Sequence, residues 1–459
     1  MKKLLSVLLA VFMIFALVGC GSTNETGTSD APAEDPNAGK IAINMQAFTD
    51  EVPGMLQKFL DTHPEYGDKY YMNEVITATT DNLYEPVLDE ALKAGEVDIY
   101  AAEAAFVAKY TQGDMCEFAA AYDDLGIDTA KAVADSQIAS YSVELGTRPS
   151  DGKVVGLGYQ ATGGCFIYRR SIATAVFGDD KPETVEAAIG ANSGNWDKFF
   201  EAAEACKKAG YKIISGDGDM WHAVENSSST GWIVDGKLVI PAEREEFLDL
   251  SKRLKDNEYH NDTQDWQEGW FADMKKSGTA LGFYGPAWLI NYSMHDNAGI
   301  GTNDSSEGDW GVCTSNIGFF WGGTWVLASK DVIGTEKQDV VKAFIEWVTL
   351  DSSNDGLQYQ WANGLYKAGD TTKDTVASGV VMDKSNGEVE FLGGQNMFDK
   401  FVPANKYANG KNLTQYDGLI NTAWRDAVRG YTGGTTTRDE AIAAFKTAVT
   451  GLGLDIVVE

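Results

Sequence analysis

Basic residues are scarce in this 459-residue chain, which has 37 Lys and Arg against 68 Asp and Glu and a formal net charge of -31 at pH 7. Beyond the pair Arg169-Arg170, no run of Lys or Arg stands out. This excludes nucleic acid as a partner and disfavours a polyanionic substrate. The eight arginines of the whole chain also offer little for clamping a carboxylate or phosphate group. The charge distribution therefore favours a neutral ligand.

Motifs that carry catalysis or hold a metal are also missing. The sequence has no GxSxG, HExxH or GxxxxGK[ST] motif, and its four histidines show no ligand spacing. The run VVGLGYQA matches GxGxxA, but a strand-like segment follows it where a dinucleotide site needs a helix. Asp217 and Asp219 in GDGDMW lack the remaining oxygen ligands of an EF-hand loop, so a tight turn is favoured. We expect no enzyme activity, no cofactor and no metal.

Cysteines are few and widely spaced, and none forms a CxxC pair. Cys116, Cys165, Cys206 and Cys313 lie far apart, and a chain of this length does not need a disulfide scaffold. Free thiols are therefore favoured. Four cysteines nevertheless allow three pairings, among which the sequence does not choose.

The first twenty residues, MKKLLSVLLAVFMIFALVGC, join two lysines to an apolar stretch that is too short for a typical membrane span. This stretch ends in Leu17-Val18-Gly19-Cys20, which resembles the lipobox of bacterial lipoproteins. In that family the signal is cut before the cysteine, whose thiol then receives a diacylglycerol. We expect a signal peptide over 1–19 and a lipidated Cys20 on the extracytoplasmic face of the cell membrane. Residues 20–39 have no large apolar or aromatic side chain, which predicts a flexible tether.

Strand and helix patterns alternate after the tether. The expected elements are a strand at 40–48, a helix over 52–60, a strand at 70–78, a helix over 84–92 and a strand at 97–103. Gly95 should end the second helix. This order predicts a parallel α/β sheet. Capping boxes are predicted ahead of two later helices, at Thr335 with Gln338 and at Thr437 with Glu440.

Five segments carry a family resemblance, namely LYEPVLDEALKAGEVDIYAAE, GKVVGLGYQATGGCFIYRRS, KKSGTALGFYGPAWLINY, FFWGGTWVLASK and TGGTTTRDEAIAAFKTAV. Their order resembles the extracellular solute-binding proteins of ABC importers, in the carbohydrate-binding branch typified by maltose-binding protein. The resemblance covers nearly the whole mature chain. It fails over 365–400, where nothing aligns.

The resemblance implies a two-lobed periplasmic-binding-protein-like α/β fold of type II. Each lobe would hold a doubly wound, mostly parallel sheet flanked by helices, with a hinge between the lobes. The length agrees, because about 420 residues exceed what one core usually supports. The expected division assigns 40–155 and 315–360 to the first lobe, and 156–314 and 361–459 to the second.

Ligands of open α/β sheets bind beyond the carboxyl ends of the strands. Sugars present CH-rich faces to aromatic rings, and hydroxyls to carboxylates and amides. The strand ends and the resemblance predict these ligand-binding residues: Phe48, Asp50, Glu51, Asp81, Asn82, Glu103, Gln160, Thr162, Trp221, Tyr284, Trp288, Trp321, Trp325, Tyr416 and Asp417. Each has a structural alternative. Phe48, Asp50, Glu51, Asp81 and Asn82 could cap helices, Glu103 could be solvated, and Gln160 and Thr162 could be polar groups of a hinge strand. The tryptophans and Tyr284 could be core residues.

The run GFFWGGTWVLAS could be a core strand or a surface that binds sugar rings. Trp321 and Trp325 share strand parity, whereas Phe320 points the other way. Gly322 and Gly323 would bend the strand and permit the close approach of a ligand. We predict that Phe320 is core and that Trp321 is a sugar platform, and Trp325 stays open between the two.

The function implied by the resemblance is that of a lipid-anchored, monomeric solute-binding protein. It would capture a neutral mono- or oligosaccharide between its lobes and hand it to the transmembrane subunits of an ABC permease. Two alternatives stay open. One is a secreted glycoside hydrolase, which needs only two carboxylates at the right separation. The other is a binding protein for a non-sugar solute such as a peptide.

Overall fold

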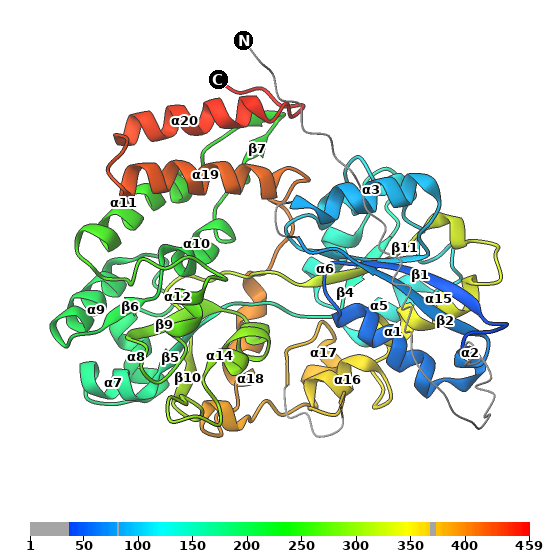
Figure 1. The fold of residues 1–459 in the computed structure, drawn as a ribbon, viewed down its shortest axis with the longest axis horizontal. Helices are drawn as coiled ribbons and strands as arrows, with labels where there is room; N and C mark the ends of the chain where they lie inside the picture. The colour runs from blue at the N-terminus through cyan, green and yellow to red at the C-terminus, as the bar shows by residue number, and fades with distance from the viewer. Residues whose placement is uncertain (1–35, 80–81, 368–372) are drawn as a thin grey trace, which may run out of the picture.

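Two lobes stand side by side in the computed structural model, which describes residues 36–79, 82–367 and 373–459 (Figure 1). Each lobe is built on one β-sheet packed against helices. The two-lobed α/β fold expected from the sequence is thus confirmed. The predicted signal peptide, the lipidation site Cys20 and most of the tether lie outside the described residues.

The first sheet has the strand order β2-β1-β3-β11-β4. Its strands are β1 (Ile41–Ala47), β2 (Tyr70–Ile76), β3 (Ile99–Glu103), β4 (Gly156–Gly158) and β11 (Thr324–Ala328). β1 runs parallel to β2 and β3, whereas β11 runs antiparallel to β3 and β4. The sheet is therefore mixed, and the expectation of a mostly parallel sheet is corrected here. The reason is that β11 enters from the second lobe, at the edge where β3 ends.

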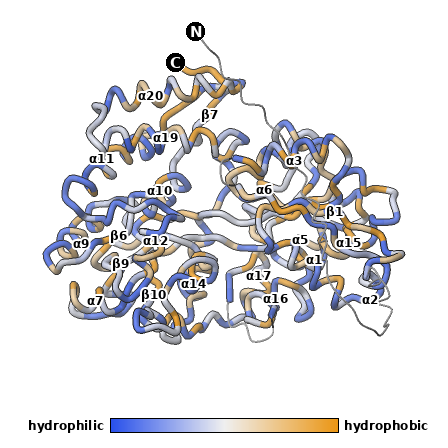
Figure 2. Tube along the Cα trace, in the orientation of Figure 1, coloured by the Kyte–Doolittle hydropathy of each residue, from blue (hydrophilic) through white to orange (hydrophobic). Residues whose placement is uncertain are grey.

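Helices cover both faces of the first sheet. One face packs against α1 (Glu51–Thr62), α5 (Thr129–Ser136), α15 (Gln338–Ile345) and the π-helix η5 (Glu346–Leu350). The other face packs against α3 (Tyr84–Ala94), α4 (Val107–Thr111) and α6 (Ser140–Gly146). Short helices complete this part of the chain: α2 (Pro64–Gly67), η2 (Cys116–Phe118) and η4 (Lys330–Val332). Figure 2 shows hydrophobic segments, in orange, gathered around the first sheet and hydrophilic ones, in blue, toward the outside of the lobe.

The second sheet has the strand order β10-β5-β9-β6. Its strands are β5 (Cys165–Arg169), β6 (Lys212–Ile214), β9 (Ala280–Gly285) and β10 (Trp310–Cys313). β5 runs antiparallel to β9 and β10, and β6 runs parallel to β9, so this sheet is also mixed rather than mostly parallel. A separate hairpin pairs β7 (Ile233–Val234) with β8 (Lys237–Leu238).

Two groups of helices surround the second sheet. The larger core lies among α7 (Arg170–Phe177), α8 (Pro182–Ile189), α9 (Asp197–Lys208), α10 (Asp217–Glu225), α11 (Ala242–Asp256), α19 (Asp417–Thr432) and α20 (Arg438–Gly451). The opposite face meets α12 (Glu268–Ala272), α13 (Ala287–Leu289), the π-helix η3 (Ile290–Met294), η6 (Glu390–Leu392) and α18 (Phe398–Ala404). The short helices α14 (His295–Asn297) and η7 (Asn405–Tyr407) complete the lobe.

The chain crosses between the sheets at 159–164 and again at 314–323. These two segments are hydrogen-bonded to each other: the Gly164 N–H donates to the Phe319 carbonyl at 2.9 Å, and the Trp321 N–H to the Thr162 carbonyl at 3.1 Å. β4 pairs with β11 in the first sheet, before the first crossing. The lobe boundaries expected from the sequence stay predictions.

The chain passes between the two cores a third time near two short helices, α16 (Leu357–Ala362) and α17 (Gly379–Met382). Both lie below the two crossing segments in Figure 1. Leu357 belongs to a core of the first lobe, whereas Ala362 and Val381 belong to a core of the second. This passage overlaps the segment 365–400 over which the family resemblance fails.

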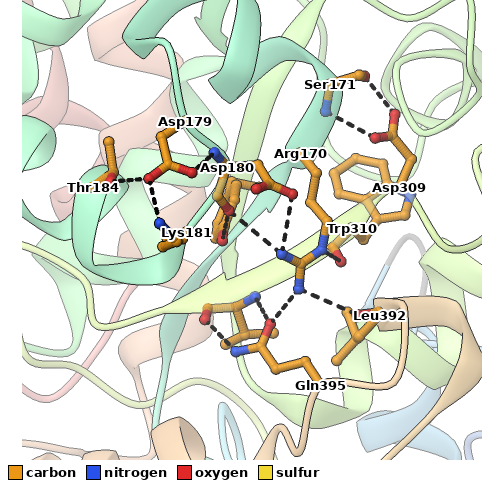
Figure 3. Close-up of polar contacts among 12 residues, drawn as sticks. Arg170, Ser171, Asp179, Asp180, Lys181, Thr184, Asp309, Trp310, Leu392 and Gln395 are labelled. Atoms are coloured by element: carbon orange, nitrogen blue, oxygen red, sulfur yellow. Dashed lines mark hydrogen bonds and ion pairs between the residues drawn. The ribbon is translucent and has the colours of Figure 1, made fainter.

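The basic pair Arg169-Arg170 has a structural role. Arg169 is almost fully buried and donates from Nε to Asp309 Oδ2 at 3.0 Å. Arg170 donates to the Trp310 carbonyl at 2.8 Å and to Gln395 Oε1 at 3.0 Å, as Figure 3 shows. The pair therefore ties neighbouring segments of the second lobe together and is not an exposed site for anions.

Local signals at helix ends were partly correct. α3 ends before Gly95, which adopts a left-handed conformation, and the predicted capping box at Thr437 and Glu440 forms. The box predicted at Thr335 and Gln338 does not form, because α15 begins at Gln338 itself.

The expected tight turn at Asp217 and Asp219 is also wrong. α10 begins there, because Asp219 Oδ2 accepts a hydrogen bond from the Gly216 N–H at 3.1 Å and caps the helix. The four cysteines of the described residues are free, in agreement with the favoured prediction.

Candidate functional site

Two glycines interrupt the aromatic run where it passes between the lobes. Gly322 and Gly323 have φ angles of +72° and +114°, which residues with a side chain rarely adopt. A Cβ at Gly322 would lie 3.2 Å from the Trp288 ring and 3.3 Å from Glu103 Oε1. The crossing chain therefore runs directly between a ring of the second lobe and a carboxyl group of the first.

Four aromatic rings gather beside this crossing, and we call them the aromatic wall: Trp266, Trp288, Tyr292 and Trp321. The ring centroids of Trp288 and Trp321 lie 4.8 Å apart, and Trp266 lies 6.0 Å from Trp321. Tyr292 lies 6.2 Å from Trp266 and 6.4 Å from Trp288. Trp266 is 41% exposed and Tyr292 is 54% exposed. Exposed rings that gather in one place are typical of binding surfaces.

Trp266 and Tyr292 were missed in the sequence. Tyr292 follows Trp288 by four residues, which places both on one face of the helical segment, so helical spacing could have found it. Trp266 lies in a polar loop ahead of α12 with no such signal. Its φ of 64° is a genuine outlier for a bulky residue, and such strain often accompanies functional sites.

Carboxyl groups of the first lobe approach the aromatic wall. Glu103 ends β3 beside Gly322, and Glu51 begins α1, where its carboxylate accepts a hydrogen bond from the Tyr159 hydroxyl. Burial raises the pKa of Tyr292, and the negative charges of Glu51 and Asp50 raise it further. Tyr292 of the second lobe therefore lies within electrostatic range of both first-lobe carboxylates.

Burial raises the pKa of Glu103 to about 7. The Ala105 N–H donates to Glu103 Oε2 at 2.8 Å and acts against this shift, whereas the charge of Glu225 on α10 adds to it. Asp374, which accepts a hydrogen bond from the Thr375 N–H at 2.7 Å, likewise has its pKa raised to about 7 by burial. These groups take up or release protons near neutral pH.

The predicted residues Glu103, Trp288 and Trp321 meet at this junction. Glu51, with Asp50 next to it, reaches the aromatic wall only through the effect of its charge on Tyr292. Gln160 and Thr162 are buried in the first crossing segment and bond within the protein. Gln160 Nε2 donates to Asp374 Oδ2 at 3.4 Å, and Thr162 Oγ1 donates to the Gly322 carbonyl at 3.0 Å.

Three predicted rings are core residues, and their assignment to the site is corrected. Trp221 is 3% exposed and packs on Phe247, because its loop is in fact helix α10. Tyr284 is fully buried, and its hydroxyl donates to Asn316. Trp325 lies on the sheet face covered by α3, α4 and α6. Phe320 is core, as predicted.

The remaining predicted residues have local contacts. Phe48 packs edge-on against Tyr84 with 5.7 Å between the centroids, and Asn82 is exposed. Asp417 is buried at the start of α19 and accepts a hydrogen bond from Thr414 Oγ1 at 2.5 Å. Tyr416 is half-buried against the larger core of the second lobe. Asp81 lies outside the described residues.

Neither a metal site nor a membrane span is found in the described part of the chain. Across 36–79, 82–367 and 373–459, His, Cys, Asp and Glu do not form groups of three or more that could hold a metal ion. Over the same ranges, none of the helices combines the length and the apolar character needed to span a bilayer.

Comparison with known proteins supports the fold. No protein-family model and no curated protein matches the chain. A solved extracellular solute-binding protein of family 1 is 18% identical with a TM-score of 0.64, over 89% of this chain and 99% of its own. The galacto-N-biose-/lacto-N-biose I-binding protein of the ABC transporter from Bifidobacterium longum is 16% identical with a TM-score of 0.63, over 91% of this chain and 99% of its own.

A third solved structure is the ABC transporter associated binding protein from B. animalis subsp. lactis in complex with β-1,6-galactobiose. It is 19% identical with a TM-score of 0.61, over 90% of this chain and 97% of its own. At these identities the likeness establishes the fold, which is that of two-lobed solute-binding proteins.

Glu103→Gln should reduce a pH dependence of stability. Because the pKa of Glu103 is raised from 4.5 to about 7, the folded protein binds more protons than the unfolded chain between these values. The free energy of unfolding therefore falls as pH rises through this window. Melting temperatures measured from pH 5 to 7.5 should fall less in Glu103→Gln than in the wild type. Asp374 contributes with the same sign, so the slope shrinks without vanishing; equal slopes would contradict the prediction.

Trp325→Ala should lower the free energy of unfolding by about 3–5 kcal/mol, because it empties a core position. The Ser142 carbonyl also loses the hydrogen bond that it accepts from the Trp325 indole N–H at 3.0 Å. Denaturant unfolding measures this cost. A change below about 1 kcal/mol, at the level of ordinary surface substitutions, would show that the ring is not a core residue.

Proposed function

We propose that this protein is a lipid-anchored, monomeric solute-binding protein of an ABC importer. In this role it captures a neutral mono- or oligosaccharide where its lobes meet and delivers it to the transmembrane subunits. The observation that carries the proposal is the aromatic wall of the second lobe, approached by carboxyl groups of the first. The fold shared with solved solute-binding proteins supports it. The lipid anchor rests on the sequence around Cys20 alone.

The chemistry of the junction suits a sugar. Indole and phenol rings can cover the CH-rich faces of a pyranose, and half-buried carboxyl groups can accept hydrogen bonds from its hydroxyls. Arg425, whose charge acts on Glu225, already pairs with Asp217 at 3.0 Å. It is therefore engaged and poorly placed to clamp an anionic ligand, which favours a neutral one. The solved relatives carry lacto-N-biose and β-1,6-galactobiose, two neutral disaccharides.

Trp321→Ala tests the proposal after a thermal-shift screen across neutral sugars has identified a ligand. Calorimetric titration should show that binding weakens by about 1–3 kcal/mol, because the ring area is buried mainly in the complex. Trp325→Ala is the matched control, since it removes the same side chain from the same run at a core position. It should lose stability and keep near-native affinity in the folded fraction.

The outcomes separate the alternatives. Cleavage of glycosidic bonds in the sugar panel would identify a hydrolase instead of a receptor. Stabilisation by peptides with no response to any sugar would identify a binding protein for a different solute. Near-native sugar affinity in Trp321→Ala would remove this ring from the binding site.

Closure of the lobes on the ligand should make the protein more compact. Because the lobes are joined by crossing segments, a ligand that touches both would favour their approach. Small-angle scattering should show a smaller radius of gyration with saturating sugar than without it. Trp321→Ala at the same sugar concentration, which no longer saturates its weakened site, is the control and should compact less. A confirmed ligand that leaves the wild-type profile unchanged would contradict closure.

A further inference from the structure

One face of the Trp321 ring is covered by the imidazole of His222. The two ring centroids lie 3.5 Å apart with an angle of 13° between the planes, which is a parallel stack at van der Waals contact. The other close neighbour, Trp288, meets Trp321 at 62° with 4.8 Å between the centroids, and its Nε1 donates to the Trp321 carbonyl at 3.0 Å. A ligand of Trp321 must therefore use the ring face or edges that His222 leaves free.

His222 is held in turn by an acidic residue from a different segment. Its Nε2 lies 3.3 Å from Asp265 Oδ2, and its Nδ1 lies 4.0 Å from Glu225 Oε2. Gly218, one turn earlier on α10, makes room for this contact, because a Cβ there would lie 1.9 Å from Asp265 Oδ1. α10 thus has a glycine at the position that lies against the Asp265 carboxylate.

The electrostatics favour an ionised Asp265 beside His222. Burial acts to raise the pKa of Asp265, but the neighbouring His222 outweighs this effect, and the charges of Arg425 and Arg429 lower the pKa further. The net result is a pKa of Asp265 below its ordinary value, so this carboxylate is ionised at neutral pH. Asp265 also precedes Trp266 directly, and Trp266 holds the strained φ of 64°.

A simple packing role accounts poorly for this arrangement. The His222 side chain is 12% exposed, and among the described residues neither of its ring nitrogens has a well-aligned hydrogen bond. An apolar side chain would fill the same space without the cost of burying a polar ring. Buried polar groups with incomplete hydrogen bonding call for an explanation beyond packing.

We infer that His222, held by Asp265, is a positioning residue that sets the ring plane of Trp321 and, through the chain neighbour of Asp265, the place of Trp266 in the aromatic wall. Its importance for binding rests on the proposed function, because the aromatic wall must then contact the sugar. The orientation of the rings is a property of the unliganded protein and can be measured without any ligand.

The test is fluorine NMR of the unliganded protein labelled with 5-fluorotryptophan, with resonances assigned by single Trp→Phe variants. In the wild type Trp321 should give one narrow resonance. His222→Ala removes the stacked ring and should shift the Trp321 resonance and broaden or split it. His222→Phe restores a flat ring and should restore a single narrow line.

Two further variants complete this experiment. Asp265→Asn keeps the size of the side chain but removes its charge, and it should disturb the resonances of both Trp321 and Trp266. His260→Ala is the matched control, because His260 is also buried in the second lobe and bonds through Nδ1 to the Asp262 N–H at 2.6 Å. It should leave the resonance of Trp321 unchanged.

An unchanged Trp321 line in His222→Ala would overturn the inference, and so would failure of His222→Phe to restore it. If His222→Ala does not fold, Asp265→Asn decides: a disturbed Trp321 line supports the inference and a native line overturns it. These results do not depend on sugar binding, so they stand even if the proposed function fails.

A binding measurement links this geometry to function. Maltose, lacto-N-biose and β-1,6-galactobiose serve as probes, and those that bind the wild type are titrated calorimetrically. His222→Ala should weaken binding about tenfold or more, and His222→Phe should recover it to within about threefold. In a Trp321→Ala background, His222→Ala should have little further effect, because both changes remove the same platform. Additive losses would show that His222 does not act through Trp321.

Discussion

The pairing of the two crossing segments is the constraint on which the rest of the structure depends. Thr162 and Gly164 on one segment bond to Trp321 and Phe319 on the other, so the two connections between the lobes behave as one ribbon. Because the second segment returns alongside the first, β11 enters the first sheet next to β4 and runs in the opposite direction. β11 is likewise antiparallel to β3, its other neighbour. The ribbon also brings Trp321 beside Trp288 on one side and brings the chain beside Glu103 on the other.

Most of the fold could be predicted because its signals are local. The first strands and helices follow from apolar spacing, and Gly95 marks a helix end by its own backbone preference. Signals that compete locally were less reliable. Thr335 and Gln338 have the spacing of a capping box, but Thr335 Oγ1 donates to the Val332 carbonyl and Gln338 Oε1 accepts from the Gly334 N–H. Sheet direction and the crossing points depend on contacts between distant segments and were predicted less well.

The candidate site shows the same division. Trp288 and Trp321 were found because glycine and proline neighbours set them apart from regular strands. Trp325 has the same strand parity as Trp321 and an equally aromatic context, yet helices from another part of the chain bury it. Trp266 carries no periodic signal, and only its backbone conformation in the folded protein singles it out. Burial and exposure of a ring are decided by partners that lie far away in the sequence.

Gly322 gives the junction a further property. Its missing side chain leaves room for groups of both lobes, with the Trp288 ring at 3.2 Å and Glu103 Oε1 at 3.3 Å from the position of a Cβ. Any larger residue would act as a wedge that holds the lobes apart. In a receptor that closes around its ligand, the apparent affinity scales with the population of the competent form. Under the proposed function, this single backbone position therefore helps to set how much ligand is needed to fill the protein.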